Sequence, residues 1–242
     1  MIDVRIHDNI REIIINRPEK RNALTPAMLD AITDAAASAD EHVILLRGNG
    51  PRFCAGFDLS MCRDDDTILP ALLTKLSAAI RALRRAPGPV VIAAHGAAIA
   101  GGCAILGGGD FVITDANAKL GYPVVTLGIS PAVSAPSLRG ATSGESAREL
   151  LLHPKLVDGA AAARMGLVAE CLPTPEDVEQ RARELAESIA AKPPGSVSRT
   201  KAWLNEIDMS DRDDAFDQAL QASLDLVGSE EQRELLAQIW QS

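Results

Sequence analysis

Two segments rich in glycine and alanine follow directly after apolar runs, and such small residues let a ligand approach the backbone. The first covers residues 48–59 (GNGPRFCAGFDL) and the second covers residues 95–103 (HGAAIAGGC). Free N–H groups at a turn or helix start can hold negative charge that develops on a carbonyl oxygen. The alternative is that these glycines only form turns or allow close packing. Because both segments follow predicted parallel strands, where ligands collect, their combination favours a binding or active site.

A basic cluster lies after the first predicted strand, in the segment NRPEKRNAL of residues 16–24. Arg17, Lys20 and Arg21 concentrate positive charge there on a chain whose formal net charge is -9. Guanidinium and ammonium groups bind phosphates through charge-assisted hydrogen bonds. The cluster therefore predicts a site for a phosphorylated ligand, and a solvated loop is the alternative.

Several other kinds of site have no support in the sequence. Neither a GxxxxGK[ST] nor a GxGxxG phosphate loop follows a strand. Ser143 lies in GATSG rather than in GxSxG, and the four histidines are isolated, so neither a serine nucleophile nor a metal site is predicted. The four cysteines form no CxxC pair, and we expect Cys54 and Cys103 to be buried thiols rather than nucleophiles.

The composition argues against several classes of partner. Of the 242 residues, 47% are apolar and 24% are charged, as in globular proteins. The acidic balance and an aromatic share of 3% argue against nucleic acid, which needs basic surfaces and stacking platforms. The N-terminus lacks the apolar core of a secretory signal, and no run of about 18 apolar residues predicts a membrane helix. We therefore expect a cytoplasmic protein with neither a membrane nor a nucleic-acid partner.

The elements that must position these segments alternate between strands and helices. Short apolar runs predict strands at residues 10–16, 43–47, 89–94, 111–114 and 119–121. Runs with a 3.6-residue period predict a helix that begins at Thr25-Pro26 and others at residues 68–83, 145–152, 158–165, 176–191 and 212–227. This alternation is typical of an α/β fold with parallel strands. Strand signals nearly vanish after Ser143, so we predict an α/β core over residues 1–195 and a helical C-terminal region over residues 196–242.

In combination, five segments resemble the crotonase, or enoyl-CoA hydratase/isomerase, superfamily. In order along the chain they are NRPEKRNALT, RFCAGFDL, PVVIAAHGAAIAGG, GDFVITDANAKLGYP and ELLL…DGAAAARMGLV. The resemblance covers roughly residues 5–205 and implies a spiral of ββα units with a helical trimerisation region. It also implies trimers that often pair into hexamers, and an acyl-CoA thioester as the ligand. Coenzyme A would then be part of the substrate, with no separate cofactor and no metal.

The resemblance assigns roles to particular positions. Phe57 of AGFD and Gly101 of AGG would donate the two backbone N–H groups of an oxyanion hole, which polarises the thioester carbonyl and stabilises an enolate-like intermediate. The positions where the family lines its CoA pocket are Lys20, Arg21, Ala23, Ala55, Asp58 and Leu59. For Asp58, a structural cap of the following helix is the alternative.

The departures from the family pattern concern proton transfer. Hydratases of this family place one glutamate three residues after the oxyanion glycine and another just after the (F/L)Gx-Pro turn, where this chain has Ala104 and Val124. Neither side chain can activate water or protonate a carbon. Ala132 stands where some relatives carry an aspartate, and the C-terminus lacks the basic, aromatic-containing tail that often closes over CoA.

Two functional hypotheses follow, from different classes. In the first, the chain is an enzyme that uses the oxyanion hole with an acid or base at an unusual position. Tyr122 is the first candidate for that group, and weaker candidates are Ser130, Ser134 and Glu145. In the second, the chain is a non-catalytic protein that binds or shuttles acyl-CoA. Loss of both glutamates with retention of the loops is compatible with either hypothesis.

Overall fold

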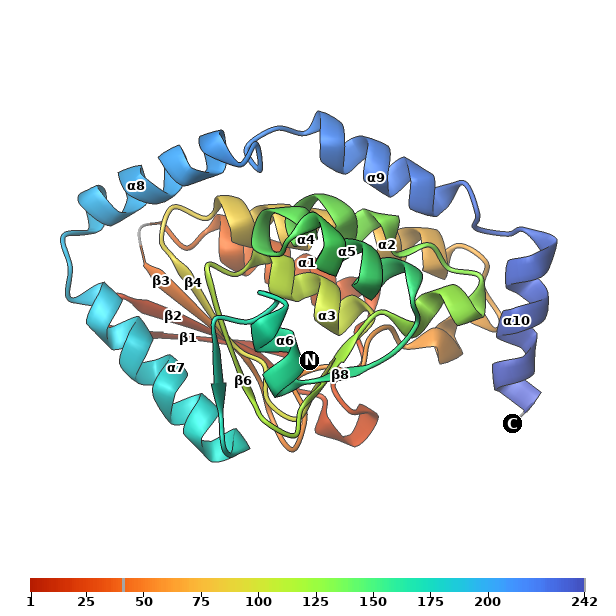
Figure 1. Cartoon of the computed structure of the whole chain (residues 1–242), viewed down its shortest axis with the longest axis horizontal. Helices are drawn as coiled ribbons and strands as arrows, with labels where there is room; N and C mark the ends of the chain where they lie inside the picture. The colour runs from red at the N-terminus through yellow and green to blue at the C-terminus, as the bar shows by residue number, and fades with distance from the viewer. Residues whose placement is uncertain (41, 242) are drawn as a thin grey trace.

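A six-stranded sheet forms the centre of the fold in the computed structural model, which describes residues 1–40 and 42–241 (Figure 1). Its strands lie in the order β1 (Ile2–His7), β2 (Ile10–Ile15), β3 (Val43–Gly48), β4 (Val90–Ala93), β6 (Phe111–Asp115) and β9 (Glu170–Leu172). β1 pairs antiparallel with β2, and each later pair of neighbours is parallel. The four predicted strands from residue 10 to residue 114 are therefore confirmed.

A second sheet has three strands in the order β5 (Ala97–Ile99), β7 (Lys119–Gly121) and β8 (Val157–Asp158). The chain runs from β4 through β5 into α3 (Gly101–Ile105), and from β6 through β7 into the 3-10 helix η4 (Pro123–Leu127). Each of these turns gives one strand to each sheet before a helix. This is the predicted α/β spiral of ββα units.

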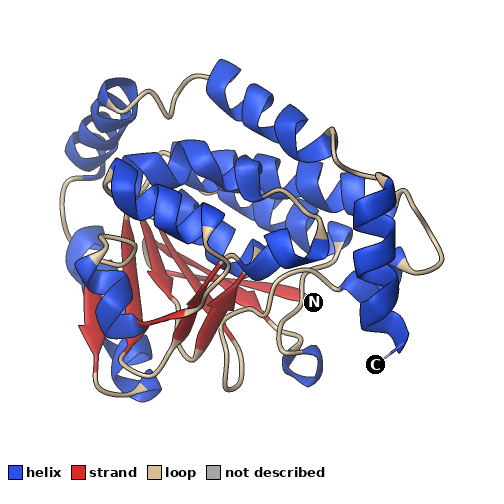
Figure 2. Cartoon of the chain, turned by 45° about the vertical axis from the view of Figure 1, so that its right-hand side comes forward, coloured by secondary structure: helices blue, strands red, loops and turns tan. Residues whose placement is uncertain are grey.

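Helices cover both faces of the large sheet, which explains why its central strands are continuously apolar (Figure 2). On one face, α1 (Pro26–Ala37) and α2 (Ile68–Arg85) share a core cluster with Ile44. On the other face, α7 (Pro175–Ala190) packs against Leu45 and its neighbours. The N-cap predicted for α1 is confirmed, because its threonine hydroxyl accepts a backbone N–H of the first turn at 3.3 Å.

The remaining α-helices come after β7 in the sequence. They are α4 (Ala135–Ala141), α5 (Gly144–Leu152), α6 (Gly159–Arg164), α8 (Pro194–Ile207), α9 (Asp214–Leu224) and α10 (Glu230–Gln241). The helices predicted at residues 145–152, 158–165 and 212–227 are confirmed as α5, α6 and α9. The helical region predicted for residues 196–242 includes Ser242, which lies outside the described residues, and the domain boundary at residue 195 stays a prediction.

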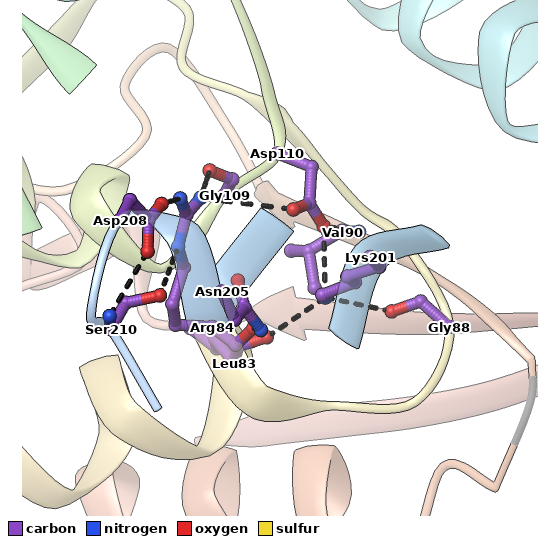
Figure 3. Close-up of polar contacts among 10 residues, drawn as sticks. All are labelled: Leu83, Arg84, Gly88, Val90, Gly109, Asp110, Lys201, Asn205, Asp208 and Ser210. Carbon is purple, nitrogen blue, oxygen red and sulfur yellow. Dashed lines mark hydrogen bonds and ion pairs between the residues drawn. The ribbon is translucent and has the colours of Figure 1, made fainter. Parts of the chain in front are cut away.

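The last three helices, α8, α9 and α10, form what we term the C-terminal arm, which runs along the outside of the other helices (Figure 1). Polar contacts fasten α8 to the core (Figure 3). Lys201 Nζ lies 2.9 Å from Asp110 Oδ2 and donates to the Gly88 carbonyl at 2.9 Å. Asn205 Nδ2 donates to the Arg84 carbonyl at 3.0 Å. Two buried polar side chains of α8 therefore attach this helix to the core.

The described residues contain neither a candidate membrane span nor a candidate metal cluster. In residues 1–40 and 42–241, no helix has both the length and the hydropathy needed to cross a membrane. Within that same part of the chain, no group of three or more His, Cys, Asp or Glu residues is placed to hold a metal ion.

Candidate functional site

Backbone hydrogen bonds join the two glycine- and alanine-rich segments. The Cys54 N–H donates to the Ala97 carbonyl at 2.9 Å, and the Ile99 N–H donates to the Cys54 carbonyl at 3.0 Å. A Cβ atom built on Gly56 would lie 3.7 Å from the Gly101 nitrogen. The peptide between residues 56 and 57 is therefore a neighbour of the Gly101 N–H, as a shared site requires.

The N–H groups of Phe57 and Gly101 donate no hydrogen bond within the part of the chain that the structure describes. The groups around Phe57 are bonded, because the Leu24 N–H donates to the Gly56 carbonyl at 2.7 Å and the Asp58 N–H donates to the Leu24 carbonyl at 2.9 Å. Gly101 opens α3, whose first N–H groups have no acceptor inside the helix. Two neighbouring donors without a protein acceptor can together bind a carbonyl oxygen that gains negative charge.

Backbone conformations with positive φ hold these two donors in place. Gly56 has a φ of +102°, and a Cβ there would lie 3.0 Å from the Ile99 carbonyl oxygen, so glycine is required. Ala100 has a φ of 53° and a ψ of -116°, which costs a non-glycine residue about 1–3 kcal/mol. Since the ψ of Ala100 sets the plane of the next peptide, this strained residue directs the Gly101 N–H.

The basic segment packs beside the first of these loops. Lys20 and Arg21 are exposed, and the Ala55 N–H donates to the Arg21 carbonyl at 3.1 Å. Ala23, Ala55 and Leu59, which the resemblance assigns to the CoA pocket, are half-buried. The structure therefore brings the predicted phosphate-binding residues and the first glycine-rich loop into one unit.

Arg17 differs from the other two cations of the basic cluster. The sequence groups it with the phosphate-binding residues, but its Nη1 lies 2.7 Å from Asp58 Oδ2, so its charge is already paired. Asp58 is 8% exposed and also accepts a hydrogen bond from the Ser60 hydroxyl. Burial opposes the charge of Asp58, but hydrogen bonds from Ser60 and Arg17 outweigh it and hold the pKa of this carboxyl below its usual value.

Asn22 holds the two segments together, and the sequence analysis does not single it out. Its side chain donates to the Asn49 carbonyl at 2.9 Å and to the Arg52 carbonyl at 2.7 Å, and it accepts from the Arg17 N–H at 2.8 Å. It is 1% exposed and has a φ of 58°, a conformation that asparagine adopts more readily than most residues. The sequence places Asn22 only in the connection between the strand predicted at residues 10–16 and the helix predicted to begin at Thr25-Pro26.

The two positions at which the resemblance implies glutamate are apolar here and are surrounded by apolar residues. Ala104 lies in α3, is 2% exposed and belongs to the main core cluster. Val124 lies in η4, is half-buried and packs against the same cluster. Neither position supplies a group that can accept or donate a proton.

The polar residues considered as replacements lie in different settings. The Tyr122 hydroxyl donates to the Cys103 carbonyl at 3.2 Å and neighbours Ser134. Burial raises the pKa of Tyr122 well above its usual value, so the phenol keeps its proton at neutral pH. The Ser130 hydroxyl accepts a backbone hydrogen bond at 3.3 Å, and Glu145 is exposed in the first turn of α5.

The two cysteines of the loops are buried, as the sequence predicts. Cys54 and Cys103 have no exposed surface, and burial raises the pKa of each thiol to about 12. A thiolate is the nucleophilic form of cysteine, and neither residue forms it near neutral pH.

Comparisons with known proteins find similar sequences and a similar fold. A family model described as enoyl-CoA hydratase/isomerase matches residues 5–235. A Thermus thermophilus protein provisionally named an enoyl-CoA hydratase is 32% identical over 216 residues, which is 86% of this chain and 85% of that protein. The crotonyl-CoA hydratase of Syntrophomonas wolfei is 30% identical over 219 residues, or 86% of this chain and 83% of that one. The crystal structure of an enoyl-CoA hydratase/isomerase from Xanthobacter autotrophicus superimposes with a TM-score of 0.86 at 26% identity, covering 98% of this chain and 91% of that one.

Proposed function

Because the chain belongs to the enoyl-CoA hydratase/isomerase family, we propose that it binds an acyl-CoA thioester with the carbonyl oxygen between the N–H groups of Phe57 and Gly101. The observation that carries this proposal is the neighbouring pair of N–H groups that have no acceptor among residues 1–40 and 42–241. In other enzymes, one such donor contributes roughly 3–4 kcal/mol of transition-state stabilisation. Both donors are main-chain atoms, so the side chain at position 57 does not weaken them.

The phosphates of CoA bind at the exposed basic segment in this proposal. Lys20 and Arg21 project from the same segment whose carbonyl at position 21 bonds to Ala55 in the first oxyanion loop. Charged hydrogen bonds to phosphate are roughly twice as strong as neutral ones. A ligand anchored there extends toward the two N–H groups.

The reaction that the site supports best is enolate chemistry on the acyl group rather than hydration. Polarisation of a thioester carbonyl acidifies the neighbouring carbon, which is the step that such reactions share. Hydration also needs a base for water and an acid for carbon, and Ala104 and Val124 provide neither. A solvent base takes the α-proton that leaves in this proposal, and Tyr122, which keeps its own proton, returns a proton to the enolate carbon and regains one from solvent.

A non-catalytic acyl-CoA binding or shuttling protein is the second candidate. The observation that favours it is the apolar packing around Ala104 and Val124, where related hydratases hold glutamates. In addition, the Tyr122 hydroxyl already has an acceptor in the Cys103 carbonyl. A site that only binds the thioester needs the two N–H groups and no proton-transfer group.

The surface of the C-terminal arm supports assembly into trimers or dimers of trimers. Trp203, Leu204 and Ile207 on α8 are 54%, 54% and 62% exposed, whereas Lys201 and Asn205 on the same helix are buried. Exposed apolar surface of this kind is typical of a contact between subunits. Leu204 and Ile207 line a groove of about 780 Å³ between α8 and the core, and much of the lining of this groove is apolar. We propose that a second copy of the chain covers this face.

Exchange of the α-protons of butyryl-CoA in D₂O separates the two candidate functions. An enzyme that forms an enolate exchanges these protons faster than buffer does, as NMR of the α-methylene signal reports. A binding protein takes up butyryl-CoA in calorimetry without accelerating the exchange. Absence of both binding and exchange would show that the proposed acyl-CoA site is wrong.

A further inference from the structure

We propose that Arg17 is a positioning residue, which links the CoA-anchoring segment to the Phe57 N–H through its ion pair with Asp58. This inference rests on the proposed function, because it assigns a role within the same site. Arg17 then has a different role from Lys20 and Arg21, because its charge is paired with Asp58 whereas theirs are exposed.

The backbone around Phe57 takes its orientation from the basic segment. The preceding carbonyl, that of Gly56, accepts from the Leu24 N–H at 2.7 Å, and the following N–H, that of Asp58, donates to the Leu24 carbonyl at 2.9 Å. Leu24 therefore holds both peptides that flank residue 57. Any movement of this segment turns the Phe57 N–H.

Arg17 adds a second connection at the same place. Its Nη1 donates both to the Ala23 carbonyl at 3.2 Å and to Asp58 Oδ2 at 2.7 Å. The two charged side chains are 22% and 10% exposed, so water only partly screens the pair. One guanidinium thus joins the residue before Leu24 to the residue after Phe57.

The rest of the segment is fixed to the same loop. The Asn22 side chain bonds to two carbonyls of residues 49 and 52, and the Ala55 N–H bonds to the Arg21 carbonyl. Phosphates bound at Lys20 and Arg21 would therefore hold a rigid unit that contains the Phe57 N–H. Binding energy from a remote part of a substrate can orient the reacting part in this way. Arginine suits the link because its planar group donates in several directions at once.

The test compares crotonyl-CoA with crotonyl-pantetheine, which lacks the phosphorylated ADP part. For each ligand, calorimetry gives the affinity and difference infrared spectroscopy gives the stretching frequency of the bound thioester carbonyl. A better-aligned donor lowers that frequency. Because a merely structural role affects stability and affinity, the infrared band is the readout specific to positioning.

In the unaltered protein, we expect a lower carbonyl frequency with crotonyl-CoA than with crotonyl-pantetheine. In Arg17→Met, the two ligands should give the same, higher frequency, while the ADP part still increases affinity. In the control Lys20→Gln, the two ligands should still differ in carbonyl frequency, whereas the ADP part should increase affinity less than it does in the unaltered protein. Arg17→Met combined with Asp58→Asn should shift the band no further than either change alone, because both break one link.

A wild-type difference between the two ligands that persists in Arg17→Met would overturn the inference, as would equal frequencies for the two ligands in the unaltered protein. If Arg17→Met does not fold, Arg17→Lys keeps the charge without the forked geometry and should give an intermediate frequency. An unchanged band in Arg17→Lys and in Asp58→Asn would then overturn the link. A bound carbonyl that keeps its solution frequency with both ligands in the unaltered protein would instead contradict the proposed oxyanion hole.

Discussion

The ring of Phe57 lies against the Cα of Gly101, so the two residues that are proposed to supply the N–H donors also contact each other. A Cβ atom built on Gly101 would lie 2.8 Å from the ring Cε1. The ring therefore occupies the space that any side chain at position 101 would need.

Gly101→Ala should destabilise the protein while it retains the N–H. Insertion of a methyl group into a packed site typically costs about 1–3 kcal/mol. Phe57→Leu in the same chain should recover part of this loss, because a smaller side chain leaves room for the methyl group. Urea unfolding of the two single variants and the double variant measures the coupling. If the changes in the free energy of unfolding simply add in the double variant, the ring does not limit the room for a side chain at position 101.

Affinity for CoA should fall when Lys20 and Arg21 are both replaced by alanine, and affinity in the unaltered protein should fall with added salt. The reason is that exposed cations bind phosphates through screened electrostatic contacts. Calorimetry at two salt concentrations measures both effects. The matched control is Arg199→Ala, which removes an exposed cation from α8. Unchanged affinity in the double variant would exclude the basic segment from the CoA site.

Asp58 should make the stability of the protein depend on pH in the acidic range. Its pKa is lowered in the folded state, so the unfolded chain binds its proton more readily. The contribution of its carboxylate is therefore present above the ordinary aspartate pKa of about 3.9 and is lost as the pH falls through the lower, folded value. Free energies of unfolding measured across this range should decrease less steeply with acid in Asp58→Asn. Identical slopes in the two proteins would contradict the lowered pKa.

The protein should sediment as a trimer or a dimer of trimers at micromolar concentration. Ile207→Asp places a charge on the exposed apolar face of α8 and should shift the population toward monomers. The control Ala27→Asp introduces the same charge on an exposed position of α1 and should leave the assembly unchanged. A stable monomer of the unaltered protein in sedimentation velocity would show that this face is not a subunit contact.

Hydration of crotonyl-CoA should be negligible beside that of a hydratase with both glutamates. One well-placed acid or base typically contributes about 10²–10⁴ in rate, and Ala104 and Val124 contribute nothing of this kind. Ala104→Glu combined with Val124→Glu should restore measurable hydration, followed by loss of the enoyl thioester absorbance. Recovery will be partial, because burial of carboxylates among apolar side chains carries a desolvation cost. Rapid hydration by the unaltered protein would show that the assignment of these two positions is wrong.

The sequence predicts the central strands well because each is a continuous apolar run with two covered faces. β1 was missed because most of it is exposed or half-buried and its pattern is broken by charges. α8 falls in the region predicted to be helical, but its start is not predicted because Pro193-Pro194-Gly195 indicates a break, whereas Pro194 lies in the first turn of the helix, where proline is tolerated. Local patterns thus identify buried elements better than elements at the surface.

The candidate site also has features that the sequence predicts and others that it does not. The glycine-rich loops could be predicted because they follow apolar strands, and the structure brings them together. The pair of Arg17 with Asp58 could not be predicted, since 41 residues separate the partners and nothing local connects them. The sequence therefore placed Arg17 with the phosphate-binding cations, and only the folded chain shows that its charge is paired.

The stretching frequency of the thioester carbonyl of bound crotonyl-CoA tests most directly whether the N–H groups of Phe57 and Gly101 form an oxyanion hole. Exchange of the residue 57 amide for an ester, with phenyllactic acid in place of phenylalanine, removes one donor and keeps the ring. The account predicts that the unaltered protein lowers the carbonyl frequency below its value in solution and that the ester form reverses part of that shift. A bound carbonyl with the same frequency as in solution, or a shift that the ester form leaves unchanged, would contradict the account.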